Sequence, residues 1–264
     1  MLKHKIVGNA LQQVVCQVEQ GQTVYAEPGK FVWKTPNMGL ETRLTTPAGN
    51  QAGAEPAKSG FLQKAMDVGK RVMAGEHLAF QYFTPVGGSG LVTFAGVLPG
   101  EVRALELDGS TGWLTERGSF VAAESGVNFD IAFTGLRTGF RSGQGFVLEK
   151  FTGTGTLIIA AAGNFIELNP AKYGGKIQAH SGCVVAFQDC LTFGVERVGG
   201  ISTQTAMTGL FGGEGINLVT LEGDGLVLLQ SVTIEALAHA LQRHMAAPGE
   251  ERKGGIGGLL EGRV

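Results

Sequence analysis

The hydrophobic and polar positions of this chain follow a pattern that is written three times. The clearest copy occupies residues 143–160, and a second copy at residues 213–230 aligns with it without a gap. A third, looser copy begins at Gly75. In the clearest copy Phe146 and Leu148 are two positions apart, which is the spacing of side chains on one face of a β-strand. We call this pattern unit A.

Unit A contains an irregular step that is followed by two glycines. The next apolar residue after Leu148 is Phe151, so the alternation changes parity at this point. A β-bulge here would keep both side chains on the inward face of the strand. Gly153 and Gly155 tolerate positive φ and predict a turn. The apolar run at residues 157–159 then predicts a second, buried strand.

A second pattern, unit B, lies between the copies of unit A. It occupies residues 24–33, 113–122 and 177–186, and each copy reads as a strand, a short turn that ends in glycine, and an apolar strand. The order along the chain is B, A-B, A-B, A. We therefore expect residues 24–33 to pair with residues 213–230. The predicted fold is all-β: three β-sandwich modules about a pseudo-threefold axis, closed by the N- and C-terminal β segments.

Three segments depart from the β pattern. Residues 35–60 are rich in Pro, Gly, Ala and Thr and predict a surface loop. Apolar residues at helical spacing predict short helices near 61–73 and 233–247. We expect residues 1–232 to form one β domain, with the loop and the first helix inserted in it. Residues 233–264 are expected to form a C-terminal helix and a flexible tail.

Composition and charge narrow the class of protein. The chain has 264 residues, of which 43% are hydrophobic, which is enough for a sizeable core. Its 43 glycines are about twice the usual share, and without a collagen-like period they fit turns and bulges. The net charge of −2 argues against a protein whose main role is to grip the nucleic-acid backbone, because that role needs a basic surface.

The cysteines and the N-terminus bear on the compartment. Cys16, Cys183 and Cys190 are odd in number and lack the tight spacing of a disulfide framework. The first fifteen residues have only broken apolar runs, so they predict a strand and not a signal peptide. No apolar stretch is long enough to span a bilayer. We therefore expect a soluble, cytoplasmic protein.

The residue types that carry chemistry do not form a recognisable set. His239 and His244 are five apart, so on a helix they diverge by roughly 140° and do not form a ligand pair. The glycine clusters lie between strands, whereas phosphate-binding loops join a strand to a helix. Ser119 and Ser181 lie outside any Gly-x-Ser-x-Gly motif. We predict no catalytic, cofactor-binding or metal-ligating residues.

Five segments together resemble the altered-inheritance-of-mitochondria protein 24 family. They are residues 24–29 (VYAEPG), 71–80 (RVMAGEHLAF), 98–100 (LPG), 118–122 (GSFVA) and 184–187 (VVAF). The resemblance covers about residues 5–230. It implies a fold like that of the tryptophan RNA-binding attenuation protein, with β-sandwich units repeated about a pseudo-threefold axis. It implies no catalytic residues and no cofactor, and RNA binding does not follow from a shared fold.

These observations favour a non-enzymatic β scaffold that forms a homo-oligomer and binds a partner protein or a membrane surface. The helix at 61–73 and the loop before it are the expected contact elements, although the helix alternatively serves as a cap on the β core. One alternative function is a cupin-like, metal-dependent enzyme with an unrecognised site. A second alternative is a single-stranded nucleic-acid binder, although the net charge makes nucleic acid an unexpected partner.

Overall fold

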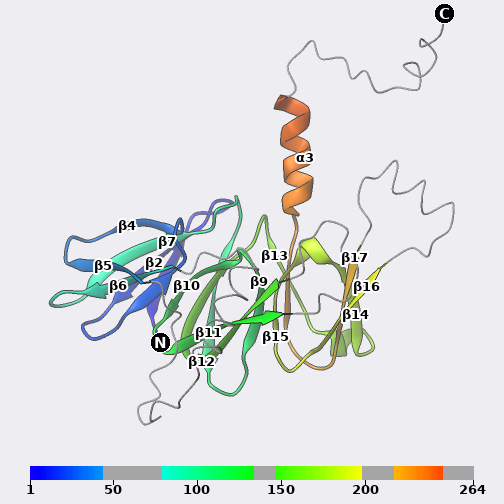
Figure 1. Ribbon diagram of the computed structural model, residues 1–264, viewed down its shortest axis with the longest axis horizontal. Helices are drawn as coiled ribbons and strands as arrows, with labels where there is room; N and C mark the ends of the chain where they lie inside the picture. Colours follow the sequence, from blue (N-terminus) through cyan, green and yellow to red (C-terminus); the bar gives the residue numbers. More distant parts are fainter. Residues whose placement is uncertain (44–78, 134–146, 198–216, 246–264) are drawn as a thin grey trace, which may run out of the picture.

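The computed structural model describes residues 1–43, 79–133, 147–197 and 217–245, which form mostly β-strands with one α-helix. The strands follow one another along the long axis of the molecule. N-terminal strands occupy one end, residues 102–160 occupy the middle, and the strands after residue 165 occupy the other end (Figure 1). The predicted predominance of β structure is therefore confirmed.

A four-stranded antiparallel sheet forms the N-terminal end. Its order is β1 (Lys3–Val7), β2 (Gln13–Val18), β7 (Gly90–Ala95) and β4 (Phe31–Lys34). Buried and half-buried residues alternate along β2, as expected for a strand with one face against a core. The sheet therefore has one face packed against its neighbour.

The largest sheet contains eleven strands, and β12 (Val147–Ala160) belongs to both of its halves. The first half also contains β8 (Val102–Asp108), β10 (Phe120–Glu124), β3 (Val24–Ala26), β6 (Phe80–Pro85) and β5 (Met38–Arg43). The second half also contains β11 (Val127–Phe133), β9 (Trp113–Glu116), β15 (Val184–Gln188), β18 (Val227–Gln230) and β13 (Phe165–Leu168).

A three-stranded sheet and a helix complete the described residues. The sheet has the order β14 (Lys176–His180), β17 (Asn217–Glu222) and β16 (Thr192–Arg197). Two short 3₁₀ turns, Pro170–Tyr173 and Ser181–Cys183, lie on either side of β14. The helix α3 (Ile234–Met245) follows β18 and confirms the helix expected near 233–247.

The glycine pair of unit A bends a strand instead of reversing it. In β12 the residues up to Gly153 pair with β11, and those from Thr154 onward pair with β8. Gly153 and Gly155 have φ of 98° and 143°, which L side chains rarely adopt. The predicted turn is therefore wrong here, because the strand continues from one half of the sheet into the other. In the last copy the matching glycines, Gly223 and Gly225, do separate β17 from β18.

The parity change in unit A reflects burial on both faces of the strand. Leu148 and Phe151 belong to two different apolar cores. Phe80 and Phe83 divide in the same way between two cores. The pairing of β12 with β11 and β9 shows no register shift between Leu148 and Phe151, so the predicted bulge is wrong at this place. A strand between two packed layers needs apolar side chains at both parities.

The first copy of unit B pairs with the first copy of unit A. β3 pairs with β6, and β4 pairs with β7, whereas β17 and β18 pair with β14 and β15. The expected pairing of residues 24–33 with 213–230 is therefore wrong, and the two ends of the chain do not close the fold. Pairing with the next unit along the chain closes a shorter loop, which costs less entropy.

The segments outside the β pattern have mixed outcomes. Met38–Arg43, which we expected in the loop 35–60, forms β5 because Met38 is buried and the strand pairs with β6. The rest of that loop, the helix near 61–73 and the tail after residue 245 lie outside the described residues. The proposed division at residue 232 stays a prediction.

Candidate binding site

The helix α3 stands away from the β body (Figure 1). The Oγ1 of Thr233 accepts a hydrogen bond from the N–H of Ala236 at 3.1 Å, which caps the first turn. Ile234, Leu237 and Leu241 follow at spacings of three and four, so they form one apolar stripe. Ile234 and Leu241 are 52% and 53% exposed, and none of the side chains described for α3 is buried.

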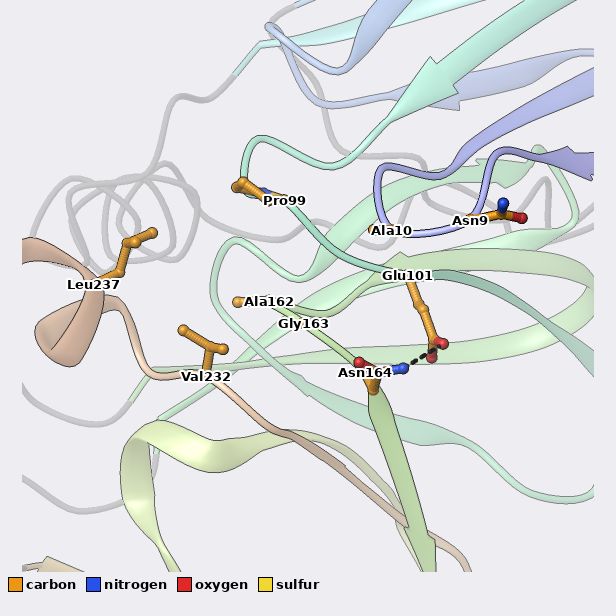
Figure 2. A pocket seen from close by; sticks show the side chains of 9 residues that line it. All are labelled: Asn9, Ala10, Pro99, Glu101, Ala162, Gly163, Asn164, Val232 and Leu237. Atoms are coloured by element: carbon orange, nitrogen blue, oxygen red, sulfur yellow. Dashed lines mark hydrogen bonds between the residues drawn. The ribbon is translucent and has the colours of Figure 1, made fainter. Parts of the chain in front are cut away.

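A cavity of about 540 Å³ lies beside the first turn of α3. Figure 2 shows Val232 and Leu237 on the side of the helix and Asn9 and Ala10 across from them. The remaining wall comes from the loop before β8 and the loop after β12. It consists of Pro99, Glu101, Ala162, Gly163 and Asn164. The cavity therefore joins the helix to both loops.

Glu101 fixes the wall of this cavity. Its Oε1 accepts from Asn164 Nδ2 at 3.0 Å, and its Oε2 accepts from the N–H of Phe165 at 2.8 Å. The backbones also meet there, because Glu101 N–H donates to the carbonyl of Gly163 at 2.9 Å. A Cβ at Gly100 would overlap the carbonyl oxygen of Ala161, so only glycine fits. The carboxylate therefore has a structural role that ties two loops together.

A smaller cavity of about 280 Å³ shares Ala162 with the first and touches Ile234. Lys30 lies in its wall and is only 4% exposed. Its Nζ donates to the carbonyl of Gly118 at 2.8 Å and lies 3.9 Å from a carboxylate oxygen of Glu27. Burial lowers the pKa of Lys30, and nearby carboxylates, Glu27 first, partly offset this effect.

Glu116 lies in the same wall and titrates near neutrality. Burial raises the pKa of its carboxyl group from 4.5 to about 7. Arg117 opposes this shift, Glu235 of α3 adds to it, and Ser119 and Lys30 oppose it less strongly. Our sequence analysis missed this residue. The signal was present in unit B, where the fourth position holds a titratable residue in each copy: Glu27, Glu116 and His180.

Among the residues that the structure describes, no histidine or cysteine lines either cavity. His180 caps a 3₁₀ turn, where its Nδ1 accepts from the N–H of Gly182 at 3.1 Å. All three cysteines are free, and burial raises the pKa of Cys16 to about 12. Within the part of the chain that the structure describes, no group of three or more His, Cys, Asp and Glu residues is placed to hold a metal ion. His77 lies outside that part.

The architecture defines the class as a mostly β protein built of packed sheets, with a helix at its C-terminal side. No helix among the described residues has the length and apolar character that a bilayer crossing needs. The chain belongs to the family described as "Mitochondrial biogenesis AIM24", whose model matches residues 4–232. Because the match covers most of the chain, the predicted family is confirmed. The match ends just before α3, so the helix lies outside the matched region.

Two similar proteins come from Streptococcus pyogenes. An uncharacterized protein of serotype M6 is 27% identical over 233 residues, which cover 88% of this chain and 86% of that protein. The crystal structure of protein SPYM3_0169 is similar with a TM-score of 0.69 and 23% identity. That likeness covers 93% of this chain and 100% of the other, and it shows a shared fold.

Proposed function

We propose that this protein is a non-enzymatic β scaffold that presents α3 to a partner protein. The observation that carries the proposal is the apolar stripe of α3, a helix that stands away from the body (Figure 1). In this stripe Ile234 and Leu241 are exposed and Leu237 is half-buried. An amphipathic helix of this kind binds by laying its apolar face in a groove of its partner. At the base of the helix, Leu237 lines the larger cavity and Ile234 lines the smaller one.

The charge on α3 favours a protein partner over a membrane. Helices that lie on anionic membranes carry many Lys and Arg residues on their polar face. The sequence of α3 holds one acidic residue, Glu235, and one basic residue, Arg243. A balanced polar face adds little attraction to lipid headgroups, whereas the apolar stripe fits a protein groove equally well.

The non-enzymatic part of the proposal draws on how the polar groups are used. Both carboxylate oxygens of Glu101 accept hydrogen bonds from Asn164 and Phe165, which leaves this group a structural role. Lys30 is committed to a backbone carbonyl. Metal analysis of the purified full chain tests the cupin-like alternative, because stoichiometric iron, manganese or zinc would contradict a scaffold.

We also propose that the body consists of three copies of one module, each with a sheet on either side of a core. A side-chain oxygen two residues after unit B accepts a hydrogen bond from a backbone N–H in the later part of unit A at three places. The bonds are Leu91 N–H to Thr35 Oγ1 (3.0 Å), Thr156 N–H to Glu124 Oε2 (2.7 Å) and Leu226 N–H to Gln188 Oε1 (2.8 Å). A cytoplasmic location is a further proposal, which the free cysteines support.

The test compares two variants of the tagged full chain in its own cells. Leu241→Asp places a charge in the stripe, and Ala236→Asp places the same charge roughly 140° away on the helix. We expect a stoichiometric partner to co-purify with the wild type and with Ala236→Asp, and to be lost with Leu241→Asp. Recovery that is equal for both variants would contradict the proposal, as would stripe-dependent binding to protein-free anionic vesicles.

A further inference from the structure

Two joints connect the strands of successive B units side by side. In the first joint β10 pairs with β3, with Ala122 opposite Ala26 and Ala123 opposite Tyr25. In the second joint β15 pairs with β9, and the register is Ala186 to Thr115, Phe187 to Leu114 and Gln188 to Trp113. Each joint fuses a strand from one unit B with a strand from the next into a continuous sheet.

The two joints have the same register when the copies of unit B are aligned. The tenth residue of one copy, Ala122 or Ala186, lies opposite the third residue of the preceding copy, Ala26 or Thr115. One further hydrogen bond extends each joint: Ser125 N–H to the carbonyl of Thr23 at 2.9 Å, and Asp189 N–H to the carbonyl of Gly112 at 3.0 Å. The same strand pairing, with the same register, therefore occurs twice within the molecule.

Two strands of the B units have a single partner strand in the described part of the chain: β4 of the first copy and β14 of the last copy. β4 corresponds to β10 and β15, and it pairs with β7. β14 corresponds to β3 and β9, and it pairs with β17. These two strands lie in separate sheets at opposite ends of the long axis (Figure 1). A third joint is therefore not made within this molecule.

The apolar residues of β4 are exposed where their counterparts are buried. Val32 and Trp33 are 49% and 41% exposed, whereas the matching residues of β10 and β15 are completely buried. Those residues are Val121, Ala122, Val185 and Ala186. All three strands also carry a register shift at the same place, at Val32, Val121 and Val185. β4 therefore has the same irregularity of register as β10 and β15, but among the described strands it lacks the second neighbouring strand that those two strands have.

We propose that β4 of one molecule pairs with β14 of a second copy of this chain and so makes the third joint between molecules. The register of the internal joints places Trp33 opposite Ala179, Lys34 opposite Gln178, and Thr35 opposite Ile177 of the other copy. The contact is head-to-tail, because the two surfaces differ, so it builds a ring or a filament of copies. It joins the four-stranded sheet of one copy to the three-stranded sheet of the next.

The backbone geometry of β4 fits this role. Thr35 N–H donates to the carbonyl of Leu91 at 2.9 Å on the side of β7. Successive N–H groups alternate along a strand, so that of Lys34 faces the open side, as a joint strand requires. Pro36 stands where Ser125 and Asp189 stand in the internal joints, and it has no N–H to donate. The joint between molecules therefore has one hydrogen bond fewer, which suits reversible assembly.

The first test measures molar mass against concentration by light scattering and sedimentation. Trp33→Asp places a charge in the joint, and Val86→Asp places one at a residue that is 76% exposed in the turn before β7. We expect the mass of the wild type and of Val86→Asp to rise with concentration, and Trp33→Asp to weaken association at least tenfold. A monomeric wild type, or unchanged association of Trp33→Asp, would overturn the proposal.

The second test asks whether the contact is head-to-tail and does not depend on how Trp33→Asp folds. Trp33→Cys and Ala179→Cys are made in separate chains that also carry Cys190→Ser, since Cys190 is exposed. Opposed residues in a pair without mutual hydrogen bonds are close enough for a disulfide. After mild oxidation, a non-reducing denaturing gel should show a cross-linked dimer for a mixture of the two chains and only monomer for each chain alone. A dimer from either chain alone, or none from the mixture, would refute the arrangement.

Discussion

Val121 in the middle of the molecule and Val32 at its N-terminal end occupy the same position in unit B, yet their surroundings differ. Val121 is completely buried, because β10 has strands on both sides. Val32 is 49% exposed, because β4 pairs with β7 alone among the described strands. Both strands carry the same register shift. Local sequence thus sets the shape of the strand, and the number of neighbouring strands sets its burial.

The largest expected effect comes from placing the same charge at both positions. Val121→Asp buries an unpaired carboxylate and should cost more than about 4 kcal/mol, which is enough to prevent folding. Val32→Asp should change the unfolding free energy of the monomer by about 0.5 kcal/mol or less. Urea denaturation at low protein concentration measures both. Equal costs would show that the edge of β4 is covered in solution even in the monomer.

The next effect concerns Phe151, which is completely buried among aromatic rings. Its ring centroid lies 4.8 Å from that of Phe120 and 5.5 Å from that of Phe129. Phe151→Ala should therefore cost about 3–5 kcal/mol. Phe151→Leu should cost less, because Leu221 occupies the matching place in the last copy of unit A. Calorimetry of the two variants checks the order, and equal melting temperatures would contradict it.

Part of this fold could be predicted from the sequence alone. The alternation of apolar residues predicted the strands, and the spacing near the C-terminus predicted α3. The pattern does not show which strands become neighbours, so the predicted pairing of residues 24–33 with the last unit A was wrong. The change of parity at Phe151 looked like a bulge, because burial on both faces and a bulge leave the same spacing.

The candidate site was harder to predict than the fold. Glu116 owes its raised pKa first to burial, which only the fold creates, and then to Glu235 of α3, which is far away in the sequence. A single sequence gives residue types but not these distances. The repeat did place titratable residues at the fourth position of unit B, which marks the place without giving the environment. The exposed edge of β4 was likewise hidden, because Val32 and Val121 are the same residue type.

A smaller effect is the pH dependence that Glu116 should confer. The folded state has a carboxyl pKa of about 7 in place of 4.5. It therefore keeps a proton that the unfolded chain releases, and stability falls as pH rises from 4.5 to 7. The loss is at most about 3 kcal/mol, and solvent near the cavity reduces it. Glu116→Gln should remove this slope and be more stable than the wild type at pH 8. A parallel pH profile for both proteins would contradict the assignment.

The smallest effect on stability should follow removal of α3, because its side chains are far more exposed than those of the β body. None of the side chains described for α3 is buried, so a chain that ends after Thr233 should lose no more than about 1 kcal/mol of unfolding free energy. Removal of Glu235 also takes away a negative charge that raises the pKa of Glu116, so the pH slope should shift toward lower pH. Denaturation across pH measures both results together. A large loss of stability would mean that the stripe of α3 covers the body, which would leave it unable to serve a partner. If neither the stability nor the pH slope changed, Glu235 would not act on the pKa of Glu116. That result would agree with a stripe of α3 that does not cover the body.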